Sequence, residues 1–284
     1  MPNLSELKSQ LRPYQETGVF WLFFLYLHGL SGLLCDDMGL GKTHQSMGLI
    51  SAIFSLNKEN SKPKPKIIIV CPTSVMYHWR EKLNEFMPLI KVFSYHGQKR
   101  ALKDFEGYDI FLTTYGILRS DAKEISKIAF DLLICDEIQI AKNSISRVHQ
   151  ALISVNAFMR LGLTGTPIEN NLSELRTLFE IVLPGYMPPE KEYKEYFQKA
   201  IEKENDENRK KTLRRLIHPF VLRRIKKEVL EDLPEKTEEV SHCDLTDNQL
   251  VLYNEVLTKS REKILHEIEN YSKPVPLVHI FALL

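Results

Sequence analysis

Short apolar runs recur along the first half of the chain, and each is followed by a stretch whose apolar residues fall at helical spacing. The runs predict strands at GLLC (32–35), IIIVC (67–71), VFSYH (92–96), DIFLTTY (109–115), DLLICD (131–136) and RLGLTG (160–165). Strands that are apolar throughout and separated by amphipathic helices are typical of a parallel sheet buried on both faces. We therefore predict an α/β fold, a parallel sheet with helices on both faces.

The pattern changes after about Pro184. The segment PGYMPPEKEYKEYFQKAIEKENDENRKKTLRRLIHPF is highly charged, with apolar residues at helical spacing, and predicts a helical subdomain packed on the sheet domain. Helical spacing returns from about Thr246, and the chain ends on the apolar run PLVHIFALL without a capping signal, which indicates a fragment. We expect three parts, with boundaries at 1–184, 185–240 and 241–284.

One apolar stretch raises the question of a membrane span. Residues 17–35 contain no Asp, Glu, Lys or Arg, and their length would just cross a bilayer. Polar and glycine residues interrupt the stretch, at His28, Gly29, Ser31 and Gly32. We therefore predict a helix followed by a short strand, and no membrane span.

Composition narrows the class of protein. Of the 284 residues, 43% are hydrophobic and 26% charged, which is typical of a globular protein, and the formal net charge is +1. A domain that holds nucleic acid by bulk charge would be far more basic, so any such site must be a local patch. The cysteines at 35, 71, 135 and 243 form no CxxC pair, which predicts core residues in a reducing cytosol rather than zinc ligands.

The first candidate for chemistry is the loop after the strand GLLC. DDMGLGKT (36–43) matches the phosphate-loop pattern except that Asp36 replaces its first glycine. Gly39 and Gly41 let the backbone curl, so that successive N–H groups of Asp36, Asp37, Met38, Gly39, Leu40 and Gly41 face an anion. Lys42 is expected to neutralise the β- and γ-phosphates of ATP, and Thr43 to ligate Mg²⁺. A glycine-rich turn with a solvated lysine is the alternative, and the flanking strand and helix argue against it.

A second candidate is the acidic pair that ends DLLICDEIQ (131–139). Such a strand brings one aspartate to magnesium and a second carboxylate to the attacking water, roles that we assign to Asp136 and Glu137. Acids after a strand also cap helices, so the motif alone is ambiguous. Paired with the phosphate loop at the same edge of a parallel sheet, it predicts a nucleotide hydrolase.

These motifs, taken in order, resemble those of a known family. LRPYQ (11–15), DDMGLGKT, IVCPTSVMYHW (69–79), LTTYGILRSD (112–121), DEIQIAKN (136–143) and LTGTPIENNLSELRTLF (163–179) occur as they do in the first RecA-like lobe of Swi/Snf-type ATPases of helicase superfamily two. VLRRIKKEVLEDLPEKTE (221–238) resembles the segment that follows the family's helical protrusion. The resemblance implies a RecA-like P-loop sheet at 1–184, a protrusion and brace at 185–240, and the start of a linker to a second lobe at 241–284.

The resemblance also assigns roles to single residues. It places Gln15 on adenine, helped by Tyr14 or Arg12. It places one DNA strand against Pro72, Thr73, Ser74, Thr113, Thr114 and Tyr115. Thr164, Gly165 and Thr166 match the motif that links the γ-phosphate to DNA, with Asn170 and Asn171 after it. Trp79 matches a buried tryptophan, for which core packing is favoured over base stacking.

Some positions depart from the family pattern. Gln139 stands where histidine is commoner, and it is expected to act in catalysis by hydrogen-bonding to the LTGT segment (163–166). Asp37, Ile138 and Arg176 also differ from the usual residues. The arginines that the family's second lobe brings to the γ-phosphate have no counterpart in these residues. The chain alone is therefore expected to bind ATP and Mg²⁺ but to hydrolyse ATP weakly.

The run RRLIHPFVLRRIKKEV allows two interpretations. In the first, its basic residues form a brace or contact the DNA backbone; in the second, they form a solvated helix face. The resemblance favours a brace role for Arg223 and Arg224.

For the whole protein we predict a monomeric double-stranded DNA translocase that contacts the DNA backbone and remodels a DNA-bound protein complex. It would act in a bacterial-type cytosol or nucleoid, or in a eukaryotic nucleus. A strand-separating helicase and a degenerate scaffold are the alternatives.

Overall fold

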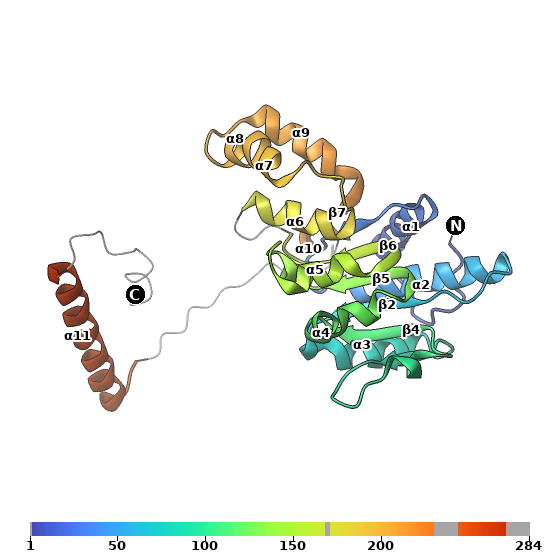
Figure 1. The fold of residues 1–284 in the computed structure, drawn as a ribbon, viewed down its shortest axis with the longest axis horizontal. Helices are drawn as coiled ribbons and strands as arrows, with labels where there is room; N and C mark the ends of the chain where they lie inside the picture. Colours follow the sequence, from blue (N-terminus) through green and yellow to red (C-terminus); the bar gives the residue numbers. More distant parts are fainter. Residues whose placement is uncertain (1, 168–170, 230–243, 271–284) are drawn as a thin grey trace. The chain divides into compact units, whose positions relative to one another are not determined.

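The computed structural model describes residues 2–167, 171–229 and 244–270, with side chains to residue 262. The chain divides into two compact units, Met1–Asp232 and Leu233–Leu284. The first unit contains the sheet and the helices around it, and the second contains helix α11 (Asp247–Asn270), close to the helical start predicted at Thr246 (Figure 1). The three-part division predicted from the sequence stays a prediction.

The sheet is parallel throughout, as predicted. Its strands among the described residues are β1 (Gly32–Leu34), β2 (Ile67–Cys71), β3 (Val92–Ser94), β4 (Ile110–Thr114), β5 (Ala129–Asp136), β6 (Asn156–Leu163) and β7 (Val221–Leu222). Their order across the sheet is β3-β4-β2-β5-β6-β1-β7. In the register, Leu34 of β1 pairs with Leu163 of β6, which pairs with Asp136 of β5. Because these three strands end level, the loops after them share one edge of the sheet.

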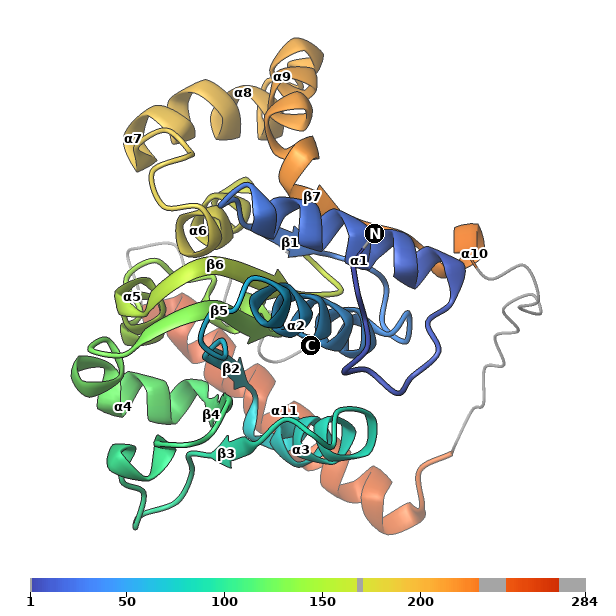
Figure 2. The same ribbon diagram turned by 90° about the vertical axis from the view of Figure 1, so that its right-hand side faces the viewer.

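Both faces of the sheet are covered, which confirms the prediction from the apolar runs. One face packs against α1 (Pro13–Leu27), α2 (Lys42–Glu59) and α3 (Thr73–Phe86), and the other against α4 (Tyr115–Ile125), α5 (Arg147–Ser154) and α6 (Leu172–Val182) (Figures 1 and 2). Along β2 the side chains alternate, with Ile67 and Ile69 toward α1–α3 and Ile68 toward α4–α6. Strands flanked in this way have no polar face, which is why they read as continuous apolar runs.

The apolar stretch 17–35 divides as predicted. Its first part is the end of α1, where Leu22 and Leu25 are buried in the core, and its last part is β1. Within the described residues, no helix combines the length and the hydropathy that a membrane crossing requires.

The charged segment after Pro184 is mostly helical. It forms α7 (Glu190–Tyr193), the π-helical stretch η3 (Lys194–Lys199), α8 (Ala200–Glu202), α9 (Glu207–Ile217) and the 3₁₀ turn η4 (His218–Phe220). Figures 1 and 2 show α7, α8 and α9 gathered beyond α6, at one end of the first unit. The chain then returns to the sheet as β7, beside β1, and continues into α10 (Lys226–Val229). The sequence did not predict this return, because a two-residue strand has no periodicity to detect.

The observed strand bounds differ from the predicted ones in every run except IIIVC, including at the carboxyl ends of β4 and β3. Tyr115, predicted at the end of a strand, is the first residue of α4, because the Thr114 side chain accepts a hydrogen bond from the Ile117 amide and caps the helix. Tyr95 and His96 lie beyond the end of β3.

The cysteines at 35, 71 and 135 are buried free thiols, as predicted, and burial raises the pKa of each to about 12. Cys243 lies outside the described residues.

Arg160 on β6 holds two helix ends to the sheet. Only 9% of the residue is exposed. Its guanidinium donates to the carbonyls of Leu152 (2.9 Å), Ile153 (3.1 Å), Ile181 (3.3 Å) and Val155. The last carbonyls of a helix lack partners within it, so this side chain satisfies groups that burial would otherwise leave unpaired.

Replacing Arg160 with Met keeps a similar stem but removes every one of these donors. Each buried carbonyl left unpaired costs about 1–3 kcal/mol, so we expect the free energy of unfolding to fall by about 3–5 kcal/mol. Urea denaturation followed by circular dichroism measures the change. Arg147→Met, at an exposed position on α5, is the control and should shift it by no more than about 0.5 kcal/mol. An equal loss in both variants would contradict the assignment.

Candidate functional site

Most of the predicted nucleotide residues meet in one cavity of about 560 Å³ at the carboxyl edge of the sheet, whereas Asp36, Asp37 and Leu40 do not line it. Its lining consists of Arg12, Tyr14, Gln15, Met38, Gly39, Gly41, Lys42, Thr43, His44, Val75, His78, Asp136 and Glu137. A larger cavity of about 800 Å³ lies in the helical segment, and none of the predicted site residues lines it. Convergence of the predicted chemistry, rather than size, identifies the candidate site.

The loop 36–43 has the curvature that its glycines predict. Gly39 and Gly41 adopt positive φ angles of 86° and 75°, a conformation that other residues rarely adopt. A Cβ on Gly41 would come within 2.3 Å of Nε2 of Gln15, so the close approach of α1 also requires glycine there. Gly41 is the N-cap of α2, and the positive end of that helix dipole therefore faces the cavity.

The Lys42 side chain and the LTGT segment both lie close to the phosphate loop. Nζ of Lys42 donates to the carbonyl of Asp36 at 2.7 Å. A Cβ on Gly165 would lie 3.4 Å from the Met38 side chain and 3.9 Å from Nζ of Lys42. Thr164 is buried, and its amide donates to the Leu34 carbonyl at 3.2 Å. The structure thus brings Gly165 next to the phosphate loop.

Asp136 is held by groups that the sequence did not predict. Its Oδ2 accepts a hydrogen bond of 2.7 Å from the indole nitrogen of Trp79, and its Oδ1 accepts one of 3.1 Å from the Glu137 amide. The Tyr115 hydroxyl donates to the Asp136 carbonyl at 2.7 Å. Burial raises the pKa of Asp136, while the bond from Trp79 and the charge of Lys42 act in the opposite direction. Trp79 is fully buried, as core packing requires, but it also orients the predicted magnesium ligand.

Glu137, the acid next to Asp136, has an unusual backbone conformation. Glu137 has φ 50° and ψ 52°, left-handed values that are uncommon for residues other than glycine. This turn places Glu137 on the cavity wall directly after β5.

Gln139 makes a different hydrogen bond from the one predicted. Its Nε2 donates to Oε2 of Glu137 at 2.6 Å, and its Oε1 is buried without a partner among the described residues. The predicted bond to the LTGT segment is therefore absent from this structure. The reason is local, because the 3₁₀ turn η2 (Ile138–Ala141) brings the side chain back to the acid two residues before it. The catalytic role of Gln139 stays a prediction.

Gln15 is buried and engaged within the protein. It accepts a hydrogen bond from the Arg12 amide (2.9 Å) and donates to the Leu40 carbonyl (3.2 Å), to which the Tyr14 hydroxyl also donates (3.1 Å). These contacts tie α1 to the phosphate loop. The adenine contact of Gln15 stays a prediction.

The residues predicted to contact DNA have two different environments. Thr73 and Ser74 are exposed at the start of α3, after Pro72. The other hydroxyls are buried and engaged: Thr113 donates to the Tyr95 carbonyl, Thr114 caps α4, Tyr115 donates to the Asp136 carbonyl, and Thr164 accepts from the Thr166 amide. In this structure only the first group offers hydroxyls to solvent. Asn170 lies outside the described residues, and Asn171 caps α6.

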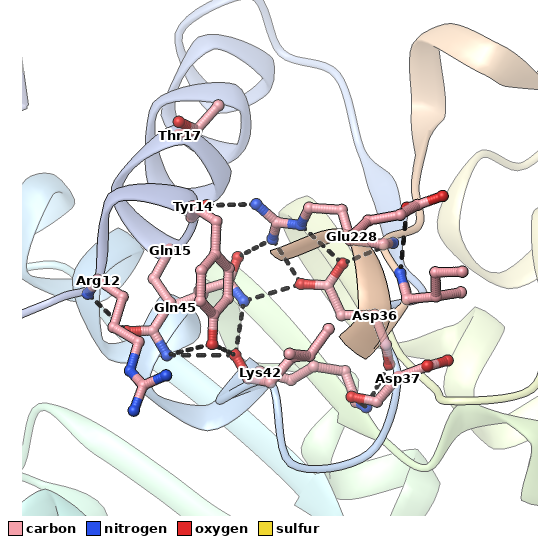
Figure 3. Close-up of polar contacts among 12 residues, drawn as sticks. Arg12, Tyr14, Gln15, Thr17, Asp36, Asp37, Lys42, Gln45 and Glu228 are labelled. Atoms are coloured by element: carbon pink, nitrogen blue, oxygen red, sulfur yellow. Dashed lines mark hydrogen bonds and ion pairs between the residues drawn. The ribbon is translucent and has the colours of Figure 1, made fainter. Parts of the chain in front are cut away.

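Several residues of the site were missed from the sequence. His44, Val75 and His78 line the cavity, and burial lowers the pKa of His44. Gln45 and Arg224 contact the phosphate loop, and Figure 3 shows Gln45 and Tyr14 close to Asp36. The sequence named Arg224 only as a brace, together with Arg223, and nothing in that charged run distinguished the two. The structure separates the two: Arg223 is exposed, whereas the Arg224 side chain is only 12% exposed.

The donor set fits Mg²⁺ bound together with a nucleotide. The described residues contain no cluster of three or more His, Cys, Asp or Glu that would hold a metal without further ligands. Thr43 and Asp136 lie on one cavity, and Mg²⁺ commonly takes one or two protein oxygens and completes its shell with water and phosphate oxygens.

Comparison with known proteins agrees with this geometry. The family model of the SNF2-related domain matches residues 14–277. TATA-binding protein-associated factor MOT1 of Saccharomyces cerevisiae is 36% identical over 98% of this chain and 16% of its own length. Chromatin-remodeling ATPase INO80 of Arabidopsis thaliana is 34% identical over 89% of this chain and 18% of its own length. The chain thus spans less than a fifth of either relative.

A solved structure shares the fold. The Sulfolobus solfataricus SWI2/SNF2 ATPase core in complex with double-stranded DNA aligns with a TM-score of 0.71 at 33% identity, covering 100% of this chain and 59% of that one. The predicted RecA-like fold is therefore confirmed.

The bond between Trp79 and Asp136 can be measured with a double-mutant cycle. Combining Trp79→Phe with Asp136→Ala cancels the packing lost in each single variant, and we expect a coupling free energy of about 1–3 kcal/mol in urea unfolding. The control cycle uses Trp21→Phe, because that indole donates to the Pro219 carbonyl instead. Coupling near zero in the first cycle would show that the bond contributes nothing to stability.

Proposed function

The chain belongs to the SNF2-related family, and on that premise we propose that it is the ATP-binding lobe of a DNA-dependent ATPase that translocates along double-stranded DNA. One observation carries the proposal: Lys42, Thr43, Asp136 and Glu137 line the same cavity. They come from two loops 94 residues apart (136 − 42), which level strand ends bring together.

The geometry supports a division of labour among these residues. Backbone N–H groups of the loop and the start of α2 receive the phosphates, with the Lys42 ammonium on the β- and γ-oxygens. Thr43 and Asp136 would hold Mg²⁺, which would neutralise charge that develops on the phosphates. Glu137 orients the attacking water and accepts its proton. The short bond from Gln139 limits the rotation of that carboxylate.

We assign the adenine base to Arg12, Tyr14 and Gln15, which also line the cavity. A side-chain amide can offer both a donor and an acceptor to an adenine edge, and in this structure the Gln15 amide is bonded to the Arg12 amide and the Leu40 carbonyl. The position of Gly165 beside Met38 and Lys42 supports a link between the phosphates and the LTGT segment.

The proposed contacts with DNA and with DNA-bound proteins rest on membership of the family. We assign backbone contacts with double-stranded DNA to Pro72, Thr73, Ser74, Thr113, Thr114, Tyr115, Thr164 and Gly165. For the buried residues among them the assignment rests on the family pattern alone, because their hydroxyls are engaged within the protein. The partner of the whole protein is then a DNA-bound protein complex, and the protein acts as a monomer.

Two alternatives stay open. A strand-separating helicase of the same superfamily would unwind a duplex, whereas a translocase would displace a third strand from a triplex without unwinding. A degenerate scaffold would keep its DNA-dependent function after Lys42→Ala. The complete set of Lys42, Thr43, Asp136 and Glu137 favours an active site over a scaffold.

The proposed roles separate in a pair of variants. Glu137→Gln should keep affinity for the fluorescent nucleotide mant-ATP with Mg²⁺ but lower kcat by about 10²–10⁴-fold, since it removes the general base. Lys42→Ala should weaken that affinity by about 10-fold or more, through the loss of a charged hydrogen bond. The matched control is Glu124→Gln, an exposed acid on α4 that pairs with Lys127. Full turnover by Glu137→Gln would remove Glu137 from the mechanism.

Hydrolysis by this chain alone should be slow. An arginine supplied from a second lobe contributes about 10³–10⁵-fold to turnover in related phosphoryl transfer. We therefore expect a longer chain that carries the second lobe to exceed this one by about 10³-fold or more in a DNA-stimulated ATPase assay. Robust DNA-stimulated turnover from these 284 residues by themselves would contradict the need for a second lobe.

A further inference from the structure

Asp36 stands where a phosphate loop usually has glycine, and its carboxylate is completely buried. A buried carboxylate must be paired and hydrogen-bonded. Both of its oxygens are satisfied, with Oδ1 accepting from the backbone amide (3.1 Å) and Nε (3.0 Å) of Arg224 and Oδ2 accepting from Nη2 of Arg224 (2.5 Å) and Nε2 of Gln45 (3.0 Å). Asp36 thus binds a residue 188 positions later in the chain, and its side chain is not free for a nucleotide.

The guanidinium of Arg224 reaches three elements at once. Besides the two-point contact with Asp36, it donates to Oε1 of Gln45 on α2 at 2.6 Å and to the carbonyl of Tyr14 on α1. Its planar fork allows these bonds together, a geometry that a lysine lacks.

Backbone contacts run parallel to this ion pair. The Cys35 amide donates to the Leu222 carbonyl (2.7 Å), and the Asp37 amide to the Arg224 carbonyl (3.0 Å). The Lys226 amide donates to Oδ2 of Asp37 at 3.1 Å. The segment 222–226 therefore lies along the start of the phosphate loop as an added strand and its extension.

A glycine in the middle of α1 makes room for this arrangement. A Cβ on Gly18 would stand 1.9 Å from Oε1 of Gln45 and 2.9 Å from Nη2 of Arg224. Glycine inside a helix costs about 0.5–1 kcal/mol relative to alanine. Its presence here has a steric reason, which is the approach of Gln45 and Arg224.

We infer that Arg224 is a positioning residue for the phosphate loop, and that through Asp36 it couples the segment after the helical protrusion to nucleotide affinity. The segment is bound to the loop by side chain and backbone, so displacing it removes the partner of a buried carboxylate inside the loop. Coupling between two sites is reciprocal, so nucleotide must in turn hold the segment in place. The inference rests on the proposed ATP site and adds a means of regulating it.

Nucleotide affinity tests the coupling directly. In titrations with mant-ATP and Mg²⁺, Arg224→Lys should weaken binding by about 5- to 50-fold, because it keeps the charge but loses the fork. Arg223→Lys is the matched control: it changes the exposed neighbouring arginine, which has no hydrogen bond or ion pair within the described part of the chain, and should stay within about twofold.

A second pair of variants changes no charge. Gly18→Ala forces the Gln45 amide away from Arg224 and should weaken mant-ATP binding in the same direction as Arg224→Lys. Gly116→Ala, on α4, is the control. A Cβ at that position would meet nothing within 4 Å, so the affinity for mant-ATP should stay unchanged. If Arg224→Lys does not fold, the comparison of Gly18→Ala with Gly116→Ala tests the inference without it.

Hydrogen exchange provides the readout that a purely structural role would not move. Mant-ATP with Mg²⁺ should slow amide exchange in a peptide covering 221–229 of the wild type, and Arg224→Lys should reduce that protection. Peptides from β2 and β4 should not respond.

The outcomes separate the inference from the function beneath it. Wild-type protein that binds mant-ATP, with Arg224→Lys and Gly18→Ala binding equally well and protection unchanged, would overturn the inference and leave the proposed function standing. An equal loss in Arg223→Lys would also overturn it, because general positive charge would then explain the effect. Wild-type protein that binds no mant-ATP would overturn the proposed function, and the inference with it.

Discussion

Burial of one parallel sheet on both faces is the constraint on which the rest of this molecule depends. The strands of this sheet, which have no polar face, run in the same direction and are connected by helices, so their carboxyl ends collect at a single edge. The register puts Leu34, Leu163 and Asp136 level with one another. The phosphate loop begins two residues after Leu34, Leu163 is the first residue of the LTGT segment, and Asp136 is the first acid of the pair, so the proximity of these motifs results from the packing of the core.

The same edge shows how a buried charge organises its surroundings. Asp36 has no exposed surface, so it requires a cation and hydrogen bonds from within the protein. Arg224 supplies both, with Gln45 and the Tyr14 carbonyl completing the arrangement around the guanidinium. Removing Arg224 would leave the buried charge of Asp36 uncompensated. Because Asp36 belongs to the phosphate loop, we expect the loop itself to be disturbed. The departure from the usual glycine is thus explained by a contact distant in sequence.

Local pattern predicted much of the fold and of the site. The apolar runs predicted six of the strands, and IIIVC matches β2 residue for residue. The motifs and their order along the chain also predicted that Lys42, Thr43, Asp136 and Glu137 lie at one site, and these residues line one cavity. Prediction was weaker where a side chain chooses among several partners. Gln139 turned to Glu137 instead of the LTGT segment, and Trp79 proved to be a hydrogen-bond donor to Asp136 as well as a core residue.

What the sequence by itself determined is therefore the set of local signals: strand periodicity, glycines that permit positive φ, and reactive residues at strand ends. These depend on neighbours along the chain, which the sequence shows directly. Only the tertiary structure decided that β7 returns beside β1, that the Arg224 side chain is mostly covered while Arg223 is exposed, and that Gly18 makes room for Gln45. The physical reason is that burial and pairing are properties of three-dimensional neighbours, and two adjacent arginines in a charged run are equivalent until the fold places one of them beside a buried carboxylate.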